Sequence, residues 1–414
     1  MKWTKRSQEE IKSQVFSALA KNVNYANEII LGVPASYLDE KVFSQDNTFL
    51  KDAPFLSTMV QNPNHIGCHT IGESESFFAG THELERDLIA ICSEDILHGE
   101  VGEFDGYVAA GGTEANMQAI WIYRNYFQQE FNAKSSEIAI ICSIDSHYSM
   151  DKSSNVLGIQ IYKINTDDST KELSIDHLNQ QLDQATNDGV RYFIVISNMM
   201  TTMFGSVDKV NLYTDAFVER NLPFKLHIDG AYGGFYYPFA NKETNLNFAN
   251  PHVSSVTLDA HKMAQAPYGT GIFLIRKGLI SYATTKQASY VEGEDCTLIG
   301  SRSGANAIAV WMILSKYGPN GWFEKIFVLQ KRTDWMCEQL DELQLDYFRD
   351  PFSNIITIRS SSITAELATK YHLVPDNHHA ANWYKIVVME HVTLEKLLPL
   401  VEDLKAHFKK PMVL

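Results

Sequence analysis

The feature that most constrains the fold is an alternation of short β-rich runs with helical segments between residues 107 and 276. In the segment 174–187, for example, apolar residues recur at helical spacing. Strands that alternate with helices need crossover connections, which give a mostly parallel sheet covered on both faces. The run 271–276 follows its predecessor too closely for a crossover helix, so we expect an antiparallel partner there. The other predicted strands are 107–110, 138–142, 159–164, 192–197, 225–229 and 255–258.

The pattern changes from about Trp311 to a long helix, two short strands at 354–358 and 385–389, and a last helix with a leucine stripe. Pro399 lies within that last helix, where a proline in a regular interior costs about 3 kcal/mol. The helix should therefore start near Lys396 or be kinked. We expect a helical and loop-rich segment (1–60), a large domain (61–310) and a small α+β domain (311–414).

Charge and composition exclude several classes of partner. The chain has 35 basic and 50 acidic residues and a net charge of -15, which repels nucleic acid and anionic membranes. No apolar run is long enough to cross a bilayer, and no signal peptide is visible. The five cysteines include no C-x-x-C pair, so neither disulfides nor a cysteine metal site is expected. These features favour a cytoplasmic protein with a small-molecule partner.

A possible anion site lies at Gly111-Gly112-Thr113, between a predicted strand and an amphipathic helix. Two glycines allow close approach of the backbone, and the new helix directs free N–H groups and its positive end at the same point. Thr113 adds a hydroxyl donor. A glycine pair in this position is often only a turn. The spacing matches neither a P-loop nor a dinucleotide-binding motif.

A carboxylate and a lysine follow later strands. His227 and Asp229 share one side of a strand, and a buried Asp229 needs a cationic or N–H partner, such as a protonated heterocyclic nitrogen or loop amides. Lys262 could simply reach solvent, or it could be an amine that forms an imine. His261 could be a second anion donor, and His147 follows another strand. Together these groups are what pyridoxal phosphate requires of a protein.

The ordered motifs resemble the group II pyridoxal-phosphate-dependent decarboxylases over about residues 60–310. The motifs are Gly111-Gly112-Thr113-Glu114-Ala115-Asn116, His147, Thr201-Thr202 with Gly205 and Asp208, His227-x-Asp229-x-Ala231, His261-Lys262 and Gly300-Ser301-Arg302-Ser303-Gly304. The resemblance implies the fold type I of pyridoxal-phosphate enzymes, with a mostly parallel seven-stranded sheet and a small C-terminal α+β domain. It also implies decarboxylation of an L-amino acid to its amine.

The same resemblance implies roles around the cofactor ring. Lys262 would hold the cofactor as a Schiff base, and Asp229 would pair with the ring nitrogen. His147 would stack on one ring face and Ala231 would pack on the other, with Thr202 nearby.

Other roles concern the phosphate and a second subunit. Gly112, Thr113 and His261 would bind the phosphate. Ser301 would reach the phosphate of a partner subunit, which implies a homodimer with shared active sites. Tyr290 matches a catalytic tyrosine of the histidine and serine decarboxylase branch.

Several alternatives stay open. Met200 stands where the family usually has a small residue, so the shape of that pocket wall is not fixed by the resemblance. Arg359 could dock a carboxylate as in aminotransferases, so transamination or carbon–carbon lysis on this fold is one rival. Non-catalytic binding of a phosphorylated ligand is another. His65 and His69 show no third metal ligand, so we expect no metal. The motifs leave the substrate amino acid undecided.

Overall fold

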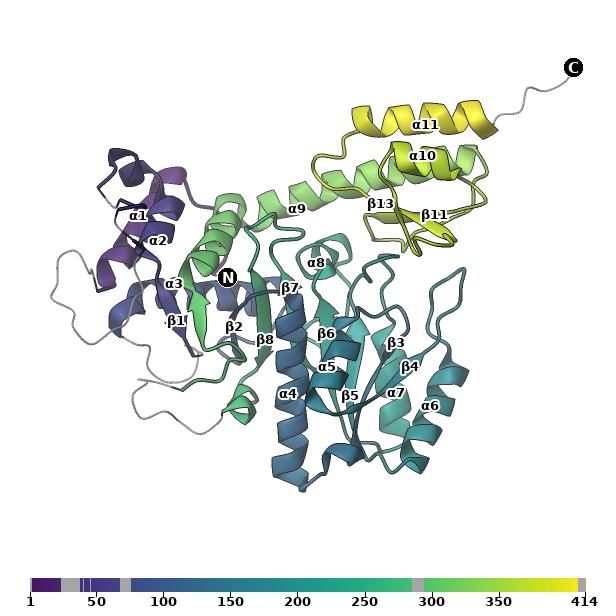
Figure 1. Cartoon of the computed structure of the whole chain (residues 1–414), viewed down its shortest axis with the longest axis horizontal. Coiled ribbons are helices and arrows are strands. Elements are labelled where there is room, and N and C mark those ends of the chain that lie inside the picture. Colours follow the sequence, from purple (N-terminus) through teal and green to yellow (C-terminus); the bar gives the residue numbers. More distant parts are fainter. Residues whose placement is uncertain are drawn as a thin grey trace, which may run out of the picture.

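The strand-like runs of the sequence form one mostly parallel sheet (Figure 1). The computed structural model describes residues 2–23, 38–39, 41–44, 46–67, 76–284 and 294–408. The strands of this sheet are β2 (Phe104–Ala109), β3 (Ile138–Ser143), β4 (Gln160–Ile164), β5 (Tyr192–Asn198), β6 (Phe224–Gly230), β7 (Val253–Asp259) and β8 (Gly271–Arg276). Their order is β2-β8-β7-β6-β5-β3-β4. As predicted, β8 is antiparallel to β7, and it also pairs antiparallel with β2.

Helices cover both faces of the sheet because neighbouring residues of each strand point in opposite directions. Ile138 and Ile140 of β3 pack in the hydrophobic cluster that contains the buried face of α4. Ala139 and Ile141 pack in a second cluster, which contains α6 and α7. Burial on both faces explains the nearly continuous apolar runs of β3, β5 and β8. These helices and their neighbours are α4 (Gly112–Phe131), α5 (Ser149–Leu157), α6 (Ile175–Asn187), α7 (Val210–Glu219) and α8 (Tyr237–Ala240).

The N-terminal part packs beside the sheet. It contains α1 (Gln8–Lys21), α2 (Pro54–Gln61) and α3 (Ala79–Ala90), which continues as a π-helical turn, η3 (Ile91–Ile96). β1 (Asn64–Ile66) pairs antiparallel with β9 (Ser301–Ser303), so the two ends of the large domain meet there. The short 3₁₀ segments are η1 (Thr48–Asp52), η2 (Ser76–Phe78), η4 (Ser135–Glu137), η5 (Gly233–Phe235) and η6 (Ile280–Ala283).

The long helix α9 (Gly304–Glu342) leads from the large domain into the small one (Figure 1). It is interrupted at Gly318, where φ is +63°, and Pro319 follows. The boundary expected at residue 311 therefore falls inside this helix. The small domain contains a four-stranded sheet of order β10-β11-β13-β12. Its elements are β10 (Tyr347–Phe348), β11 (Ile355–Arg359), α10 (Ala365–Lys370), β12 (Val374–Pro375), β13 (Trp383–Val387) and α11 (Leu394–Phe408).

The small domain has its own hydrophobic cluster, whose buried members lie between Met336 and Leu404. Its last helix, α11, begins at Leu394, two residues before the start that the sequence suggested, and runs through Pro399. Pro399 lies on the exposed face of the helix. The carbonyl that loses its N–H partner there can bond to water, which makes the proline tolerable. No helix in the described part of the chain is both long and apolar enough to span a membrane.

Close packing of α1 against α3 gives a prediction about stability. A Cβ added at Gly80 would lie 1.9 Å from the backbone oxygen of Ala18, so the two helices would have to separate. Gly80→Ala should therefore lower the free energy of unfolding by about 1–3 kcal/mol. Gly321→Ala is the matched control, because the nearest atom would be 3.7 Å away. The control should be neutral or stabilising by up to about 1 kcal/mol. Urea unfolding measures both, and equal effects would contradict the packing argument.

Candidate active site

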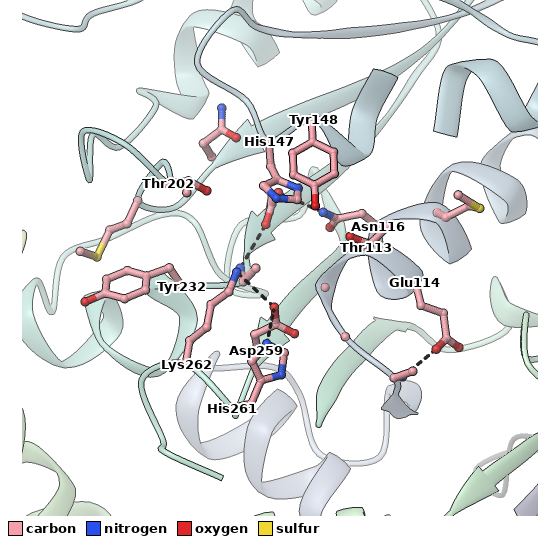
Figure 2. A pocket seen from close by; sticks show the side chains of 18 of the residues that line it. Thr113, Glu114, Asn116, His147, Tyr148, Thr202, Tyr232, Asp259, His261 and Lys262 are labelled. Carbon is pink, nitrogen blue, oxygen red and sulfur yellow. Dashed lines mark hydrogen bonds and ion pairs between the residues drawn. The ribbon is translucent and has the colours of Figure 1, made fainter. Parts of the chain in front are cut away.

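A cavity of about 510 Å³ opens at the carboxyl ends of the central strands (Figure 2). In open α/β sheets this edge is where ligands bind. The cavity gathers nearly all the residues that the sequence analysis selected. They are Gly112, Thr113, His147, Thr202, Asp229, Ala231, His261 and Lys262. Ser301 lies exposed on β9 and is not among the residues lining the cavity, and Tyr290 falls outside the described residues.

The glycine pair forms the expected cradle at the start of α4. A Cβ on Gly112 would lie 2.7 Å from Asp259 Oδ2 and 3.1 Å from the Cβ of Ala231, so a side chain would fill the space. Glu114 turns back and accepts a hydrogen bond of 2.6 Å from the N–H of Ala110. Gly112 and Thr113 of the first turn of α4 line the cavity. The N–H groups of a first helical turn have no partner within the helix, and the positive end of the helix favours an anion there. These features fit a phosphate.

Asp229 is buried at the end of β6, with 7% of its surface exposed. Its Oδ2 accepts a 3.0 Å hydrogen bond from Asn116 Nδ2, and its Oδ1 accepts a 3.1 Å bond from the N–H of Ala231. Both donors are neutral. A protonated ring nitrogen in the cavity would supply the cationic partner that a buried carboxylate needs. The site therefore fits the ring as well as the phosphate of pyridoxal phosphate.

A second carboxylate, Asp259, lies beside the lysine. Lys262 Nζ is 3.2 Å from Asp259 Oδ2, and His261 Nε2 is 3.6 Å from the same oxygen. Asp259 Oδ1 and His261 Nδ1 are buried without a hydrogen-bond partner among the described residues. These two atoms next to Gly112 can therefore form hydrogen bonds with a bound polar group. Asp259 was not identified as a site residue from the sequence, because nothing in the spacing shows that its side chain turns into the cavity.

His147 is held at one ring nitrogen. Its Nδ1 lies 2.9 Å from Ser149 Oγ and 3.2 Å from the backbone N–H of Ser149. Burial is the main cause that lowers the pKa of His147. The neighbouring ring of Tyr148 lies 4.1 Å away, centre to centre, and is 63% exposed at the cavity mouth.

The wall that contains Met200 has an unusual backbone. Met200 is buried and has φ of +71°, the left-handed region that side chains other than glycine rarely adopt. Non-glycine residues in this region mark strain, which tends to occur at functional sites. Next to it, Lys385 of the small domain donates a 2.9 Å hydrogen bond to the carbonyl of Thr202. Burial and the charge of Lys262 lower the pKa of Lys385. The small domain thus reaches the cavity wall directly.

Arg359, the candidate carboxylate anchor of the aminotransferase alternative, does not line this cavity. It pairs with Asp168, and its guanidinium lies 3.8 Å from the centre of the Trp383 ring. The structure therefore places its charge away from Lys262, which disfavours that alternative.

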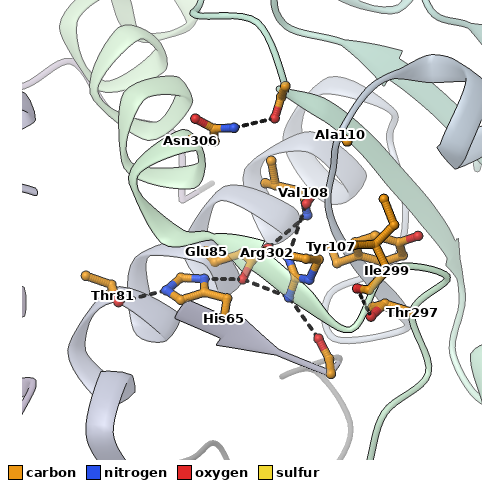
Figure 3. Close-up of polar contacts among 12 residues, drawn as sticks. His65, Thr81, Glu85, Tyr107, Val108, Ala110, Thr297, Ile299, Arg302 and Asn306 are labelled. Atoms are coloured by element: carbon orange, nitrogen blue, oxygen red, sulfur yellow. Dashed lines mark hydrogen bonds and ion pairs between the residues drawn. The ribbon is translucent and has the colours of Figure 1, made fainter. Parts of the chain in front are cut away.

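His65 belongs to a buried network that ties β1 and β9 to α3 (Figure 3). Its Nδ1 is 2.7 Å from Glu85 Oε2, and its Nε2 is 2.7 Å from Thr81 Oγ1. Arg302 of β9 pairs with the same Glu85 and donates to the carbonyl of Val108. This network fixes the strand that carries Ser301. Within the described residues no cluster of side chains could hold a metal ion, and His69 falls outside them.

His227 gives a prediction about pH. It is fully buried between Ser255 and Asn116, and burial lowers its pKa to about 4. Between pH 6.5 and 4, His227 is protonated in the unfolded chain but stays neutral in the folded protein. The free energy of unfolding therefore falls as the pH is lowered through this window. From pH 7 to pH 5 the loss from this group should be about 2 kcal/mol. In urea unfolding, the free energy of unfolding of His227→Gln should fall between pH 7 and pH 5 by about 2 kcal/mol less than that of the wild-type protein. Equal losses in both proteins would contradict the assignment.

Comparison with known proteins identifies the family. Residues 83–345 match the model described as the pyridoxal-dependent decarboxylase conserved domain. A tryptophan decarboxylase of Clostridium sporogenes is 51% identical over 409 residues, covering 99% of this chain and 98% of that protein. A probable L-tyrosine/L-aspartate decarboxylase of Methanocella arvoryzae is 29% identical over 369 residues, covering 86% and 94%.

The fold is also that of solved members of this group. L-methionine decarboxylase of Streptomyces sp. 590 superposes with a TM-score of 0.70 at 21% identity, covering 96% of this chain and 93% of that one. The cradle, the buried carboxylate and the lysine at one cavity agree with these matches. The chain therefore belongs to the pyridoxal-dependent decarboxylase family, and it is an enzyme that uses pyridoxal phosphate to release carbon dioxide from an amino acid.

Proposed function

We propose that this enzyme decarboxylates an aromatic L-amino acid, with tryptophan as its preferred substrate. The observation that carries the proposal is the 51% identity, along nearly the whole chain, to a relative named tryptophan decarboxylase. The cavity mouth supports it, because the partly exposed side chains of Tyr148, Leu298 and Ile299 line the opening. Apolar and aromatic surfaces of this kind suit a large, flat side chain.

We further propose the division of roles within the cavity. Lys262 is the covalent anchor of the cofactor, and Asp229 holds a proton at its ring nitrogen. His147 and Ala231 would contact the ring, and Thr202 would contact it from the wall that the small domain reaches. The phosphate is held by Gly112, Thr113 and His261.

Pyridoxal phosphate, when bound, supplies an electron sink for the pair of electrons left on the α-carbon when carbon dioxide departs. The chain's own groups orient the reactants around that chemistry. Asp229 keeps the ring nitrogen cationic because its own charge is buried and needs a positive partner. Ser149 holds His147 at Nδ1, which leaves Nε2 as the ring nitrogen that is free of this contact. A group near the α-carbon must then return a proton, and Lys262 Nζ and His147 are the candidates within the described cavity.

Contacts between the domains help to exclude water. Tyr232 lines the cavity, and its hydroxyl is hydrogen-bonded to the amide of Asn354 in the small domain. Lys385 makes a second bridge, to Thr202. Both contacts hold the small domain over the cavity wall.

The enzyme's assembly and setting are proposals as well. We propose a homodimer with shared active sites, in which the exposed Ser301 reaches the partner's phosphate and Tyr290 contributes to catalysis. The three-part division at residues 60 and 310 is a proposal too. The small domain has its own hydrophobic cluster from Met336 onward, whereas Trp311 and Leu329 of α9 pack in the cluster of the large domain. A cytoplasmic setting is supported by buried free thiols. These belong to Cys92, Cys142 and Cys337.

The substrate proposal is tested by measuring carbon dioxide release from each of the twenty amino acids. Tryptophan should give a kcat/KM at least about tenfold above that of aspartate or glutamate, because Tyr148, Leu298 and Ile299 offer apolar and aromatic surface to a large, flat side chain. Faster release from an acidic amino acid would refute the aromatic assignment. Appearance of a keto acid in place of carbon dioxide would refute decarboxylation itself.

The residue roles are tested by two substitutions. Lys262→Ala should abolish turnover and the visible absorbance of the covalently held cofactor. Asp229→Ala should retain bound cofactor but lose at least about 100-fold in kcat, since the ring nitrogen is no longer kept protonated. Absorbance spectra and single-turnover kinetics measure both. A persistent visible band in the first variant would mean that another amine is the anchor, and near-normal kcat in the second would refute the electronic role.

A further inference from the structure

A chain of buried hydrogen bonds continues from Asp229 into the sheet. Asn116 Nδ2 donates to Asp229 Oδ2 at 3.0 Å, and Asn116 Oδ1 lies 2.9 Å from His227 Nε2. His227 Nδ1 lies 2.6 Å from Ser255 Oγ, which also bonds to the hydroxyl of Tyr123. The side chains of Asn116, His227 and Ser255 are almost wholly removed from solvent. Groups buried this deeply must satisfy one another, so their directions are constrained.

The carboxylate fixes the direction of every bond in the chain. An ionised Asp229 can only accept, so the amide nitrogen of Asn116 faces it and the amide oxygen faces His227. His227 must then carry its proton on Nε2, which also lies 3.2 Å from Thr257 Oγ1, and accept at Nδ1 from the hydroxyl of Ser255. Tyr123 donates in turn to Ser255. The histidine is thus a neutral donor in one tautomer, and its low pKa agrees with this state.

The same amide reaches the group on the other side of the cavity. Asn116 Nδ2 also lies 3.1 Å from Ser149 Oγ, so the serine accepts there and directs its own proton to His147 Nδ1 at 2.9 Å. The backbone N–H of Ser149 donates to that nitrogen too. The proton of the neutral His147 ring is therefore on Nε2. One asparagine connects the carboxylate at the proposed ring nitrogen with the histidine at the proposed ring face.

We propose that Asn116 and His227 are positioning residues for decarboxylation: His227 fixes the amide of Asn116, and that amide aims Asp229 and orients the Ser149 hydroxyl that donates to His147. The inference rests on the proposed role of Asp229 at the ring nitrogen. Because His227 is neutral, it orients the carboxylate without adding a cation that would weaken its hold on a proton. A positive charge so close to Asp229 would stabilise the free carboxylate and favour loss of the ring proton.

The test compares two replacements of His227 in the holoenzyme. His227→Gln can keep an N–H near the position of Nε2, whereas His227→Leu has none. The readout is the ¹⁵N chemical shift of bound pyridoxal phosphate labelled at the ring nitrogen, which reports protonation of that atom. In His227→Leu the signal should move toward that of Asp229→Asn, and kcat should fall roughly tenfold with KM within about threefold. His227→Gln should retain the wild-type signal and most of kcat.

A variant with a smaller structural change keeps the test valid if His227→Leu does not fold. Ser255→Ala removes the donor that keeps the histidine proton on Nε2, so its signal should move in the same direction by a smaller amount. Circular dichroism and cofactor affinity show whether each variant is folded and loaded.

The possible results separate this inference from the proposed function. A wild-type signal in both His227→Leu and Ser255→Ala overturns the positioning role, while a shifted signal in Asp229→Asn leaves the role of Asp229 intact. If Asp229→Asn also keeps the wild-type signal, the assignment of Asp229 fails and this inference fails with it. Equal shifts in His227→Gln and His227→Leu would show that bulk alone matters, which also overturns the proposal.

Discussion

Burial of the parallel strands on both faces is the constraint on which the rest of this structure depends. Because helices cover both faces, functional groups can be exposed only where the strands end. The carboxyl ends of β2, β3, β5, β6 and β7 all meet at one edge, and the cavity is formed from the residues that directly follow them. Lys262 and His147 thus come together although 115 positions separate them in the sequence.

The cavity places two buried carboxylates in different surroundings. Asp229 accepts hydrogen bonds from neutral donors, so it can still pair with a cation in the cavity. Asp259 faces Lys262 and His261, and it lies directly under Gly112. If Lys262 is bonded to a cofactor, His261 is the remaining neighbour that can form a hydrogen bond with Asp259. The two carboxylates therefore differ in what they can bind: Asp229 has neutral donors and can accept a cationic ring nitrogen, whereas Asp259 already faces the amine of Lys262.

Much of this could be read from the sequence. The runs of apolar residues predicted each strand of the central sheet to within a few positions, and the short connection before Gly271 predicted the antiparallel member. The boundaries of the C-terminal elements were predicted less well, since α11 begins at Leu394 and residue 311 lies inside α9. Thr81 was not identifiable as a partner of His65, because that contact joins two segments whose pairing depends on β9, far along the chain.

The sequence by itself determined the fold class, the cofactor and most of the residues that gather at the cavity, because each of these depends on the pattern and order of motifs. Only the tertiary structure decided that Asp259 turns into the cavity, that Asn116 spans Asp229 and Ser149, and that Lys385 reaches Thr202 across 183 positions. Such contacts depend on the directions of side chains on separate elements. Those directions follow from how helices and strands pack together, which spacing along the chain does not encode.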